Sequence, residues 1–190
     1  VPGEPRIVEN IFKMLEALFP GRIDLGLGRA PGTDQMTSHA LRRRLDGREG
    51  DDFLERLHEL TLWETRDFPA GHPYNNVTAM PNDAPLPPIW LLGSSGYSAE
   101  LSAQVGMGFA FAHHFASHDA TDAMMQYRRN FRPSDWRSTP YAILAVAAIA
   151  AETDVEAERL ASSADLNRLL RERGQYAPLF SVEEALAYPY

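Results

Sequence analysis

Cysteine is absent from this chain of 190 residues, and lysine occurs only once, at Lys13. Without cysteine the protein can form neither disulfides nor thiolate metal sites, and this usage fits a reducing cytoplasm. Long apolar runs are also absent, because no stretch approaches the roughly 18 residues that a transmembrane helix requires. We therefore expect a cytoplasmic protein with no membrane partner.

Positive charge is scarce as well. The 18 basic residues against 26 acidic ones give a formal net charge of -8. Nucleic-acid binding depends on a basic surface that attracts phosphates, so this balance argues against a nucleic-acid partner. A hydrophobic content of 44% in 190 residues is enough to bury one core. We expect residues 1–190 to form a single domain.

Short apolar runs recur along the chain. They cover residues 23–28, 89–92, 109–112 and 141–149. The continuous run at residues 89–92 is typical of a strand that is covered on both faces, and the other three runs are also interpreted as strands. The sequence therefore predicts four strands.

Helical patterns accompany these runs. The first helix is predicted by apolar residues that share one face, namely Ile7, Ile11, Met14, Leu15 and Leu18. Asp52 and Glu55 have the spacing of a capping box, and they predict a second helix that buries Phe53, Leu57 and Leu60.

Three more helices follow the later strands. One passes through Leu101 and is expected to end at Gly106. Another is predicted for residues 119–131, where Met124, Tyr127 and Phe131 are spaced three and four residues apart. Thr153 and Glu156 form a second capping-box pattern, which opens a helix that runs towards Ala164.

The alternation of strands and helices predicts an α/β fold with a parallel sheet and helical crossovers. No hairpin pattern interrupts it. Four such units fit either an open doubly wound sheet or half of an eight-stranded barrel, and periodicity agrees with both.

A loop rich in glycine and serine follows the second strand. It consists of Gly93, Ser94, Ser95, Gly96, Tyr97 and Ser98. The free N–H groups and the positive dipole end of the next helix can hold an anion there, and three hydroxyls suit a phosphate. A second interpretation, compatible with the first, is that Ser98 caps the helix while the glycines make the turn.

Arg29 directly follows the first strand. The carboxyl ends of parallel strands meet at one edge, so Arg29 is expected at the same edge as the serine-rich loop. There it could make a charge-assisted contact with a bound phosphate. The alternative is a surface salt bridge.

Other motifs are incomplete. Gly26, Gly28 and Gly32 suggest a nicotinamide-binding fingerprint, but Pro31 takes the place of the third glycine. Residues 93–96 are one residue short of a nucleophile elbow, which argues against a hydrolase.

Three histidines lie close together after the third strand, at positions 113, 114 and 118. Neighbouring histidines at a strand end point to opposite faces, and no carboxylate is placed to complete a metal site. We therefore predict no metal site, and we expect one histidine to face a pocket.

The most distinctive stretches of the sequence are LEALFPGRIDLGLGRAPGTD at residues 15–34 and PIWLLGSS at residues 88–95. The pattern continues through residues 98–101, 106, 109–115, 127–134 and 140–141. In this order, they resemble the bacterial luciferase-like monooxygenases over nearly the whole chain. The resemblance implies an eight-stranded (β/α)8 TIM barrel, of which these residues supply the fourth to seventh strands as an internal portion, without the N-terminal strands or the final strand.

The resemblance also implies a cofactor site. In this family reduced flavin lies at the carboxyl ends of the strands and reacts with oxygen. Arg29, Ser94, Ser95 and Ser98 match positions that hold the flavin phosphate, in agreement with the helix-terminus argument. His113 matches a position against the flavin ring. The full set of cofactor-binding candidates is Arg29, Gly93, Ser94, Ser95, Gly96, Ser98 and His113.

The implied function is a flavin-dependent monooxygenase that uses reduced FMN and O2 on a small organic substrate, with a deazaflavin as a possible substitute. A flavin reductase would supply the reduced flavin, and the family is usually homodimeric. No catalytic residue is predicted, because the expected base lies outside these residues. The alternative is a truncated, non-catalytic relative that binds flavin or serves as a dimer scaffold.

Overall fold

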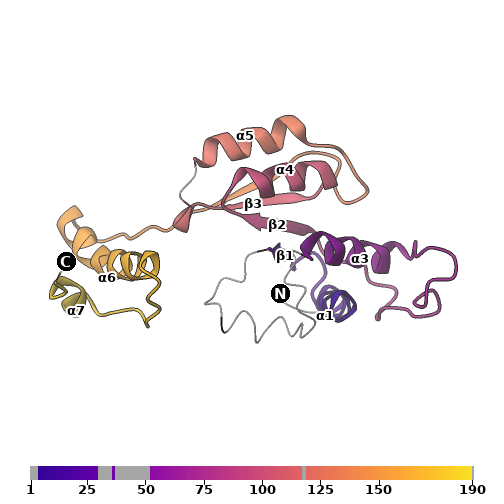
Figure 1. Ribbon diagram of the computed structural model, residues 1–190, viewed down its shortest axis with the longest axis horizontal. Helices are drawn as coiled ribbons and strands as arrows, with labels where there is room; N and C mark the ends of the chain where they lie inside the picture. The colour runs from indigo at the N-terminus through magenta and orange to yellow at the C-terminus, as the bar shows by residue number, and fades with distance from the viewer. Residues whose placement is uncertain (1–3, 30–35, 37–51, 117–118, 190) are drawn as a thin grey trace. The chain divides into compact units, whose positions relative to one another are not determined.

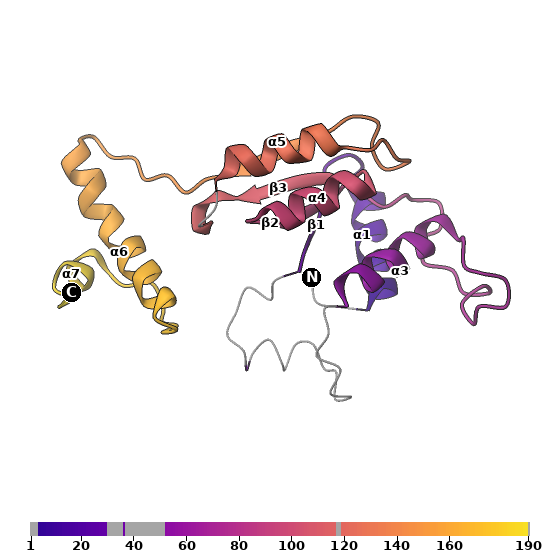
Figure 2. The same cartoon turned by 45° about the horizontal axis from the view of Figure 1, so that its top comes forward.

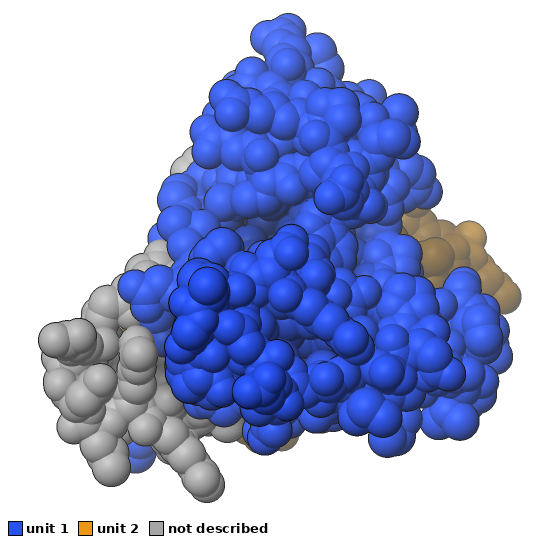
Figure 3. All heavy atoms as spheres, turned by 90° about the vertical axis from the view of Figure 1, so that its right-hand side faces the viewer, with its two compact units in different colours: residues 1–112, 116–145 blue, residues 113–115, 146–190 orange. Residues whose placement is uncertain are grey.

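The computed structural model describes residues 4–29, 36, 52–116 and 119–189, which form two compact units. The sheet unit comprises residues 1–112 and 116–145, and the helical unit comprises residues 113–115 and 146–190 (Figure 3).

The sheet unit is built on four parallel strands. They are β1 (Leu25–Gly28), β2 (Ile89–Gly93), β3 (Gly108–Ala112) and β4 (Ala142–Ala145), in the order β1-β2-β3-β4 (Figure 1). All four predicted strands are therefore confirmed. The last is shorter than expected, because Ala145 pairs with Ala112, the final residue of β3, and residues 146–149 lie beyond that partner.

Four helices accompany the sheet. They are α1 (Pro5–Leu18), α3 (Phe53–Thr65), α4 (Gly96–Val105) and α5 (Ala120–Asn130). Helix α1 packs against α3, and α4 packs against α5 (Figure 1 and Figure 2). Because a helix separates each strand from the next, neighbouring strands run in the same direction.

The core lies between the helices and one face of the sheet. The strand residues that point to the helices alternate along β1, β2 and β3, and they are Leu25, Leu27, Ile89, Leu91, Phe109 and Phe111. Strand residues of the opposite face include Leu92, which is 42% exposed, and Ile143, which is 40% exposed. If the sheet is part of a barrel, as the resemblance implies, this side is its inner face.

Helix α1 packs in an orientation that its apolar pattern does not indicate. Four residues of the predicted apolar stripe, Ile7, Ile11, Met14 and Leu18, are 49–64% exposed, and the fifth, Leu15, is partly buried. The buried side of α1 carries Val8 and two charged residues, Glu9 and Lys13. The predicted helix is confirmed, but its apolar stripe is not the face that packs on the sheet unit.

Lys13 holds this charged side in place. Its Nζ atom lies 2.7 Å from Oε2 of Glu64 on α3 and 3.4 Å from Oε1 of Glu9. The other oxygen of Glu64 accepts a hydrogen bond of 3.0 Å from the backbone N–H of Leu86. Burial raises the pKa of Glu9 to about 7, although Lys13 opposes the rise. The cluster therefore ties α1, α3 and the segment before β2 together.

The predicted start of the second helix differs in detail. Asp52 precedes α3 but its side chain does not cap the helix, and its carboxylate accepts a hydrogen bond of 2.8 Å from Nε of Arg56. Its φ of -89° and ψ of 11° depart from the extended conformation of a typical N-cap, so the predicted capping box is wrong. Leu57 and Leu60 are buried as expected, and Phe53 is partly buried.

Tyr127 connects α5 to the starts of two strands. Its hydroxyl donates a hydrogen bond of 2.9 Å to the carbonyl of Met107 and accepts one of 3.1 Å from the N–H of Tyr141. The side chain is fully buried, and this burial raises the pKa of the phenol. The predicted apolar face of α5 is thus confirmed at this position.

The helical unit contains η1 (His113–Phe115), α6 (Asp154–Glu172) and α7 (Val182–Leu186). Thr153 caps α6 as predicted, by accepting a hydrogen bond of 3.2 Å from the N–H of Glu156. The helix extends beyond Ala164, because Leu166 and Leu170 continue its buried side and pack against Ala185 of α7. Gly174, with a φ of 75°, follows the end of the helix.

Candidate cofactor site

The serine-rich loop lies at the carboxyl edge of the sheet. Strand β2 ends at Gly93, and Ser95 occupies the N-cap position of α4 in an extended conformation. The first-turn N–H groups of a helix have no intrahelical acceptor, and the first turn of α4 contains no acidic residue. The edge therefore presents N–H donors and a positive dipole end, both of which favour an anion.

Gly93 and Ser98 approach each other closely in this loop. A β-carbon on Gly93 would overlap the Cβ and Oγ atoms of Ser98. Ser98 is the third residue of α4, so the prediction that it caps the helix is wrong, and Ser95 holds that position. The glycine is required because the loop folds back on the first turn of the helix.

The hydroxyls of the loop are not committed elsewhere. Within the described residues, the side chains of Ser94, Ser95 and Ser98 form no hydrogen bond, and the hydroxyl of Ser95 does not cap α4. All three residues are partly buried. Their hydroxyl groups are thus available to a ligand.

Gly96 lies beneath helix α5. A β-carbon there would lie 3.0 Å from Oε1 of Gln126. The amide of Gln126 donates to Glu100 at 3.1 Å, and Asn130 donates to the same carboxylate at 2.6 Å. Hydrogen bonds from Asn130, from Gln104 and from Gln126, in decreasing order of effect, lower the pKa of Glu100. The acidic residue nearest the loop on α4 is therefore held by amides of α5.

Arg29 contacts the serine-rich loop from the neighbouring strand. Its Cζ atom lies 4.4 Å from the centroid of the Tyr97 ring. The register explains this meeting, because Gly28 at the end of β1 pairs with Leu92 near the end of β2. The structure thus brings Arg29 together with the loop, as the strand order predicted, while the role of Tyr97 was missed. The only indication in the sequence was its position between Gly96 and Ser98.

His113 begins η1 directly after β3, and its side chain is exposed. It is grouped with the residues of the helical unit. Its contact with a flavin ring stays a prediction. Among the described residues, no group of three or more histidine, aspartate or glutamate side chains could hold a metal ion. His118, from the predicted histidine group, lies outside the described residues, and so do Pro31 and Gly32 of the glycine pattern.

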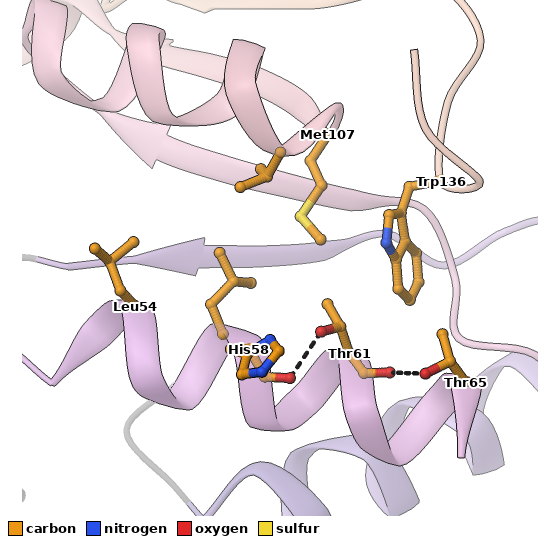
Figure 4. A pocket seen from close by; sticks show the side chains of 8 residues that line it. Leu54, His58, Thr61, Thr65, Met107 and Trp136 are labelled. Carbon is orange, nitrogen blue, oxygen red and sulfur yellow. Dashed lines mark hydrogen bonds between the residues drawn. The ribbon is translucent and has the colours of Figure 1, made fainter. Parts of the chain in front are cut away.

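A separate pocket of about 340 Å³ lies between α3 and the end of α4 (Figure 4). The residues that line it are Leu54, Leu57, His58, Thr61, Thr65, Val105, Met107 and Trp136. The hydroxyls of Thr61 and Thr65 donate to backbone carbonyls of α3. Val105 and Met107 flank the turn that leads into β3, at the amino edge of the sheet, so this pocket is distinct from the serine-rich loop.

None of the helices in the described segments has the length and apolar character needed to cross a membrane.

Comparison with known proteins identifies the same family as the sequence pattern. The model of the luciferase-like monooxygenase family matches residues 5–187. A luciferase-like monooxygenase of Escherichia coli (strain K12) is 43% identical over 175 residues, which are 92% of this chain and 51% of the relative. An N-acetyl-S-alkylcysteine monooxygenase of Bacillus subtilis (strain 168) is 35% identical over 185 residues, which are 95% of this chain and 54% of the relative.

The fold agrees with a solved structure. The crystal structure of apo-MsnO8 matches with a TM-score of 0.80 and 34% identity, over 98% of this chain and 53% of that chain. The chain spans about half the length of the curated relatives that it matches. The four parallel strands are therefore part of a TIM barrel of this type, as the resemblance implied. The chain belongs to the luciferase-like monooxygenase family.

Proposed function

We propose that the protein is a flavin-dependent monooxygenase that uses reduced FMN and O2 to oxygenate a small organic substrate. The observation that carries this proposal is the serine-rich loop, with Arg29 beside it at the carboxyl edge of the sheet. Family membership supports the monooxygenase class. In TIM barrels, this edge is where active sites lie.

The residues at this edge suit the phosphate of FMN. First-turn N–H groups of α4, the hydroxyls of Ser94, Ser95 and Ser98, and the guanidinium of Arg29 are all hydrogen-bond donors of the kind that phosphate oxygens accept. The absence of a side chain at Gly93 leaves the loop close to the helix, and no carboxylate of the first turn would repel the anion. A deazaflavin that carries a phosphate would use the same donors.

The chemistry comes from the cofactor. Reduced FMN supplies two electrons, so that one atom of O2 enters the substrate and the other leaves as water while FMN becomes oxidised. The chain's own contribution is to bind the phosphate and so to fix the orientation of the flavin at the barrel edge. His113, at the end of β3, is proposed to lie against the flavin ring.

The proposed partners follow from this chemistry. A flavin reductase supplies reduced FMN, and the substrate is a small molecule. The name of the Bacillus subtilis relative denotes a small organic substrate, an N-acetyl-S-alkylcysteine, and this supports the substrate class. We also propose a cytoplasmic homodimer.

The phosphate site is tested by flavin binding to the full-length protein. Arg29→Ala and Ser95→Ala are each expected to weaken FMN binding, with a loss of about tenfold or more for Arg29, since charge-assisted contacts contribute about 1.5–3 kcal/mol. Affinity is measured by quenching of flavin fluorescence. Arg129→Ala, in the last turn of α5, is a matched control. Unchanged FMN affinity in both site variants would reject the assignment.

The reaction is tested with isotopically labelled oxygen. The full-length protein receives chemically reduced FMN, ¹⁸O2 and an N-acetyl-S-alkylcysteine as the first candidate substrate. A product that carries one labelled oxygen atom supports the monooxygenase. Reoxidation of the flavin to hydrogen peroxide, with every candidate small molecule left unlabelled, would contradict it.

A further inference from the structure

Tyr97 contributes two groups to the carboxyl edge of the sheet. Its backbone N–H belongs to the first turn of α4, and its ring lies against the guanidinium of Arg29, 4.4 Å from Cζ. The side chain is 43% exposed. Among the described residues, this ring makes a cation–π contact with Arg29.

Stacking on a ring constrains what an arginine can do. When the flat face of the guanidinium lies on an aromatic ring, its N–H donors point outward in the plane of the group. Those in-plane donors make the paired hydrogen bonds to phosphate oxygens. An exposed arginine without such support samples many rotamers, and it must be ordered when the ligand binds.

The backbone connection fixes where the supported guanidinium lies. Because Tyr97 is the second residue of α4, its ring starts from the same turn whose N–H groups face the proposed anion. Gly28 pairs with Leu92 on the neighbouring strand, so Arg29 leaves the sheet beside the loop. The cation is therefore held next to the helix N-terminus.

We propose that Tyr97 is a positioning residue, whose ring orients the guanidinium of Arg29 towards the phosphate of the bound flavin. The inference rests on the phosphate site proposed above. An exposed contact between a guanidinium and an aromatic ring corresponds to about a two- to fivefold effect on an equilibrium. Removal of the ring should weaken the binding of a phosphorylated flavin by that factor and leave the binding of riboflavin unchanged.

The test compares Tyr97→Phe, which keeps the ring, with Tyr97→Leu, which removes it. Dissociation constants for FMN and for riboflavin are measured on the full-length protein by fluorescence quenching. Tyr97→Phe should retain the wild-type ratio of the two constants, whereas Tyr97→Leu should lower the preference for FMN two- to fivefold. Arg29→Lys, which keeps the charge without the planar group, should lower it as well, and adding Tyr97→Leu to that variant should cause no further loss.

The possible outcomes separate the two proposals. An unchanged preference for FMN in Tyr97→Leu overturns the positioning role, and so does an equal loss of affinity for both ligands, since the ring would then act on the flavin rings or on the fold. If Tyr97→Leu does not fold, Arg29→Lys decides the question. An unchanged preference of Arg29→Lys for FMN over riboflavin overturns the positioning role of Tyr97. If Arg29→Ala leaves the preference for FMN unchanged, the phosphate site itself is wrong.

Discussion

The Nζ atom of Lys13 lies 2.7 Å from Oε2 of Glu64, so the only lysine of the chain joins α1 to α3 inside the protein. The side chain of Lys13 is 7% exposed and that of Glu64 is 17% exposed. A buried pair of this kind is costly to break, because the remaining charge stays in an apolar environment without its partner.

Replacement of the lysine should therefore destabilise the fold. Lys13→Met leaves the carboxylates of Glu9 and Glu64 without their cation, and we expect a loss of about 3–5 kcal/mol in the free energy of unfolding. Urea unfolding followed by circular dichroism measures it. Arg6→Met, at an exposed position of the same helix, is the control and should cost less than 1 kcal/mol. Equal effects of the two substitutions would mean that the buried contact does not hold α1.

The stability of α1 should depend on pH. Burial raises the pKa of Glu9 from 4.5 to about 7 in the folded protein, so the protonated carboxyl is favoured there. The stabilisation that the raised pKa of Glu9 gives to the folded protein is fully present below pH 4.5, and it is lost as the pH rises through about 7. This difference in pKa between the folded and the unfolded protein corresponds to at most roughly 3 kcal/mol in the free energy of unfolding.

Glu9→Gln tests this dependence, because the amide is uncharged at every pH. We expect the variant to lose less stability than the wild type between pH 5 and pH 8 in urea unfolding. Glu4→Gln, at an exposed position, is the control and should follow the wild type. Parallel pH profiles for Glu9→Gln and wild type would show that Glu9 does not titrate in this range.

Gly93 is expected to tolerate no side chain. Gly93→Ala should distort the serine-rich loop, since its β-carbon would overlap Ser98, and we expect a loss of about 1–3 kcal/mol in stability with weaker FMN binding. Gly93→Ala combined with Ser98→Gly removes the overlap and should recover most of the stability. Thermal unfolding and FMN titration measure the two effects.

Gly28→Ala provides the matched control. A β-carbon on Gly28 would lie 3.7 Å from Cβ of Leu92, an ordinary van der Waals distance, so this variant should behave like the wild type. If Gly93→Ala is tolerated as well as Gly28→Ala, the close approach of Ser98 is not what requires the glycine.

The apolar stripe of α1 is expected to mediate self-association. Ile11 is 49% exposed among the described residues, and if the stripe forms the dimer contact, Ile11→Glu should shift a homodimer of the full-length protein towards the monomer. Light scattering coupled to size-exclusion chromatography measures the mass. Val155→Glu, on α6, is the control because Val155 is 78% exposed. A wild-type protein that is monomeric, or a dimer that Ile11→Glu does not affect, would contradict the proposed interface.

Much of the sheet unit was predictable because its strands are short apolar runs between helices. Residues 89–92 and 109–112 have the pattern of buried strands, and they form most of β2 and β3 in the structure. The end of α4 was also predictable, because glycine commonly follows the last residue of a helix, and Gly106 adopts the expected positive φ, 67°. Such local preferences act before any distant contact forms.

Helix caps were harder to predict, because a cap depends on backbone angles that spacing does not reveal. Asp52 has the correct spacing to Glu55 but not an extended backbone, and Ser98 lies inside the first turn that Ser95 opens. The candidate site was partly predictable. Parallel strands place Arg29 and the serine-rich loop at one edge, whereas the cation–π contact between Arg29 and Tyr97 required the register of β1 against β2.

By itself, the sequence determined an amphipathic helix at α1, a parallel α/β order and a serine-rich loop at a helix start, because each follows from local patterns of apolar residues and turn formers. Only the tertiary structure decided which side of α1 is buried. The side with Glu9 and Lys13 packs inward because Glu64, 51 residues further along the chain, supplies a carboxylate at 2.7 Å, and the apolar stripe remains exposed. A partner so distant in sequence cannot be read from the periodicity of a single helix.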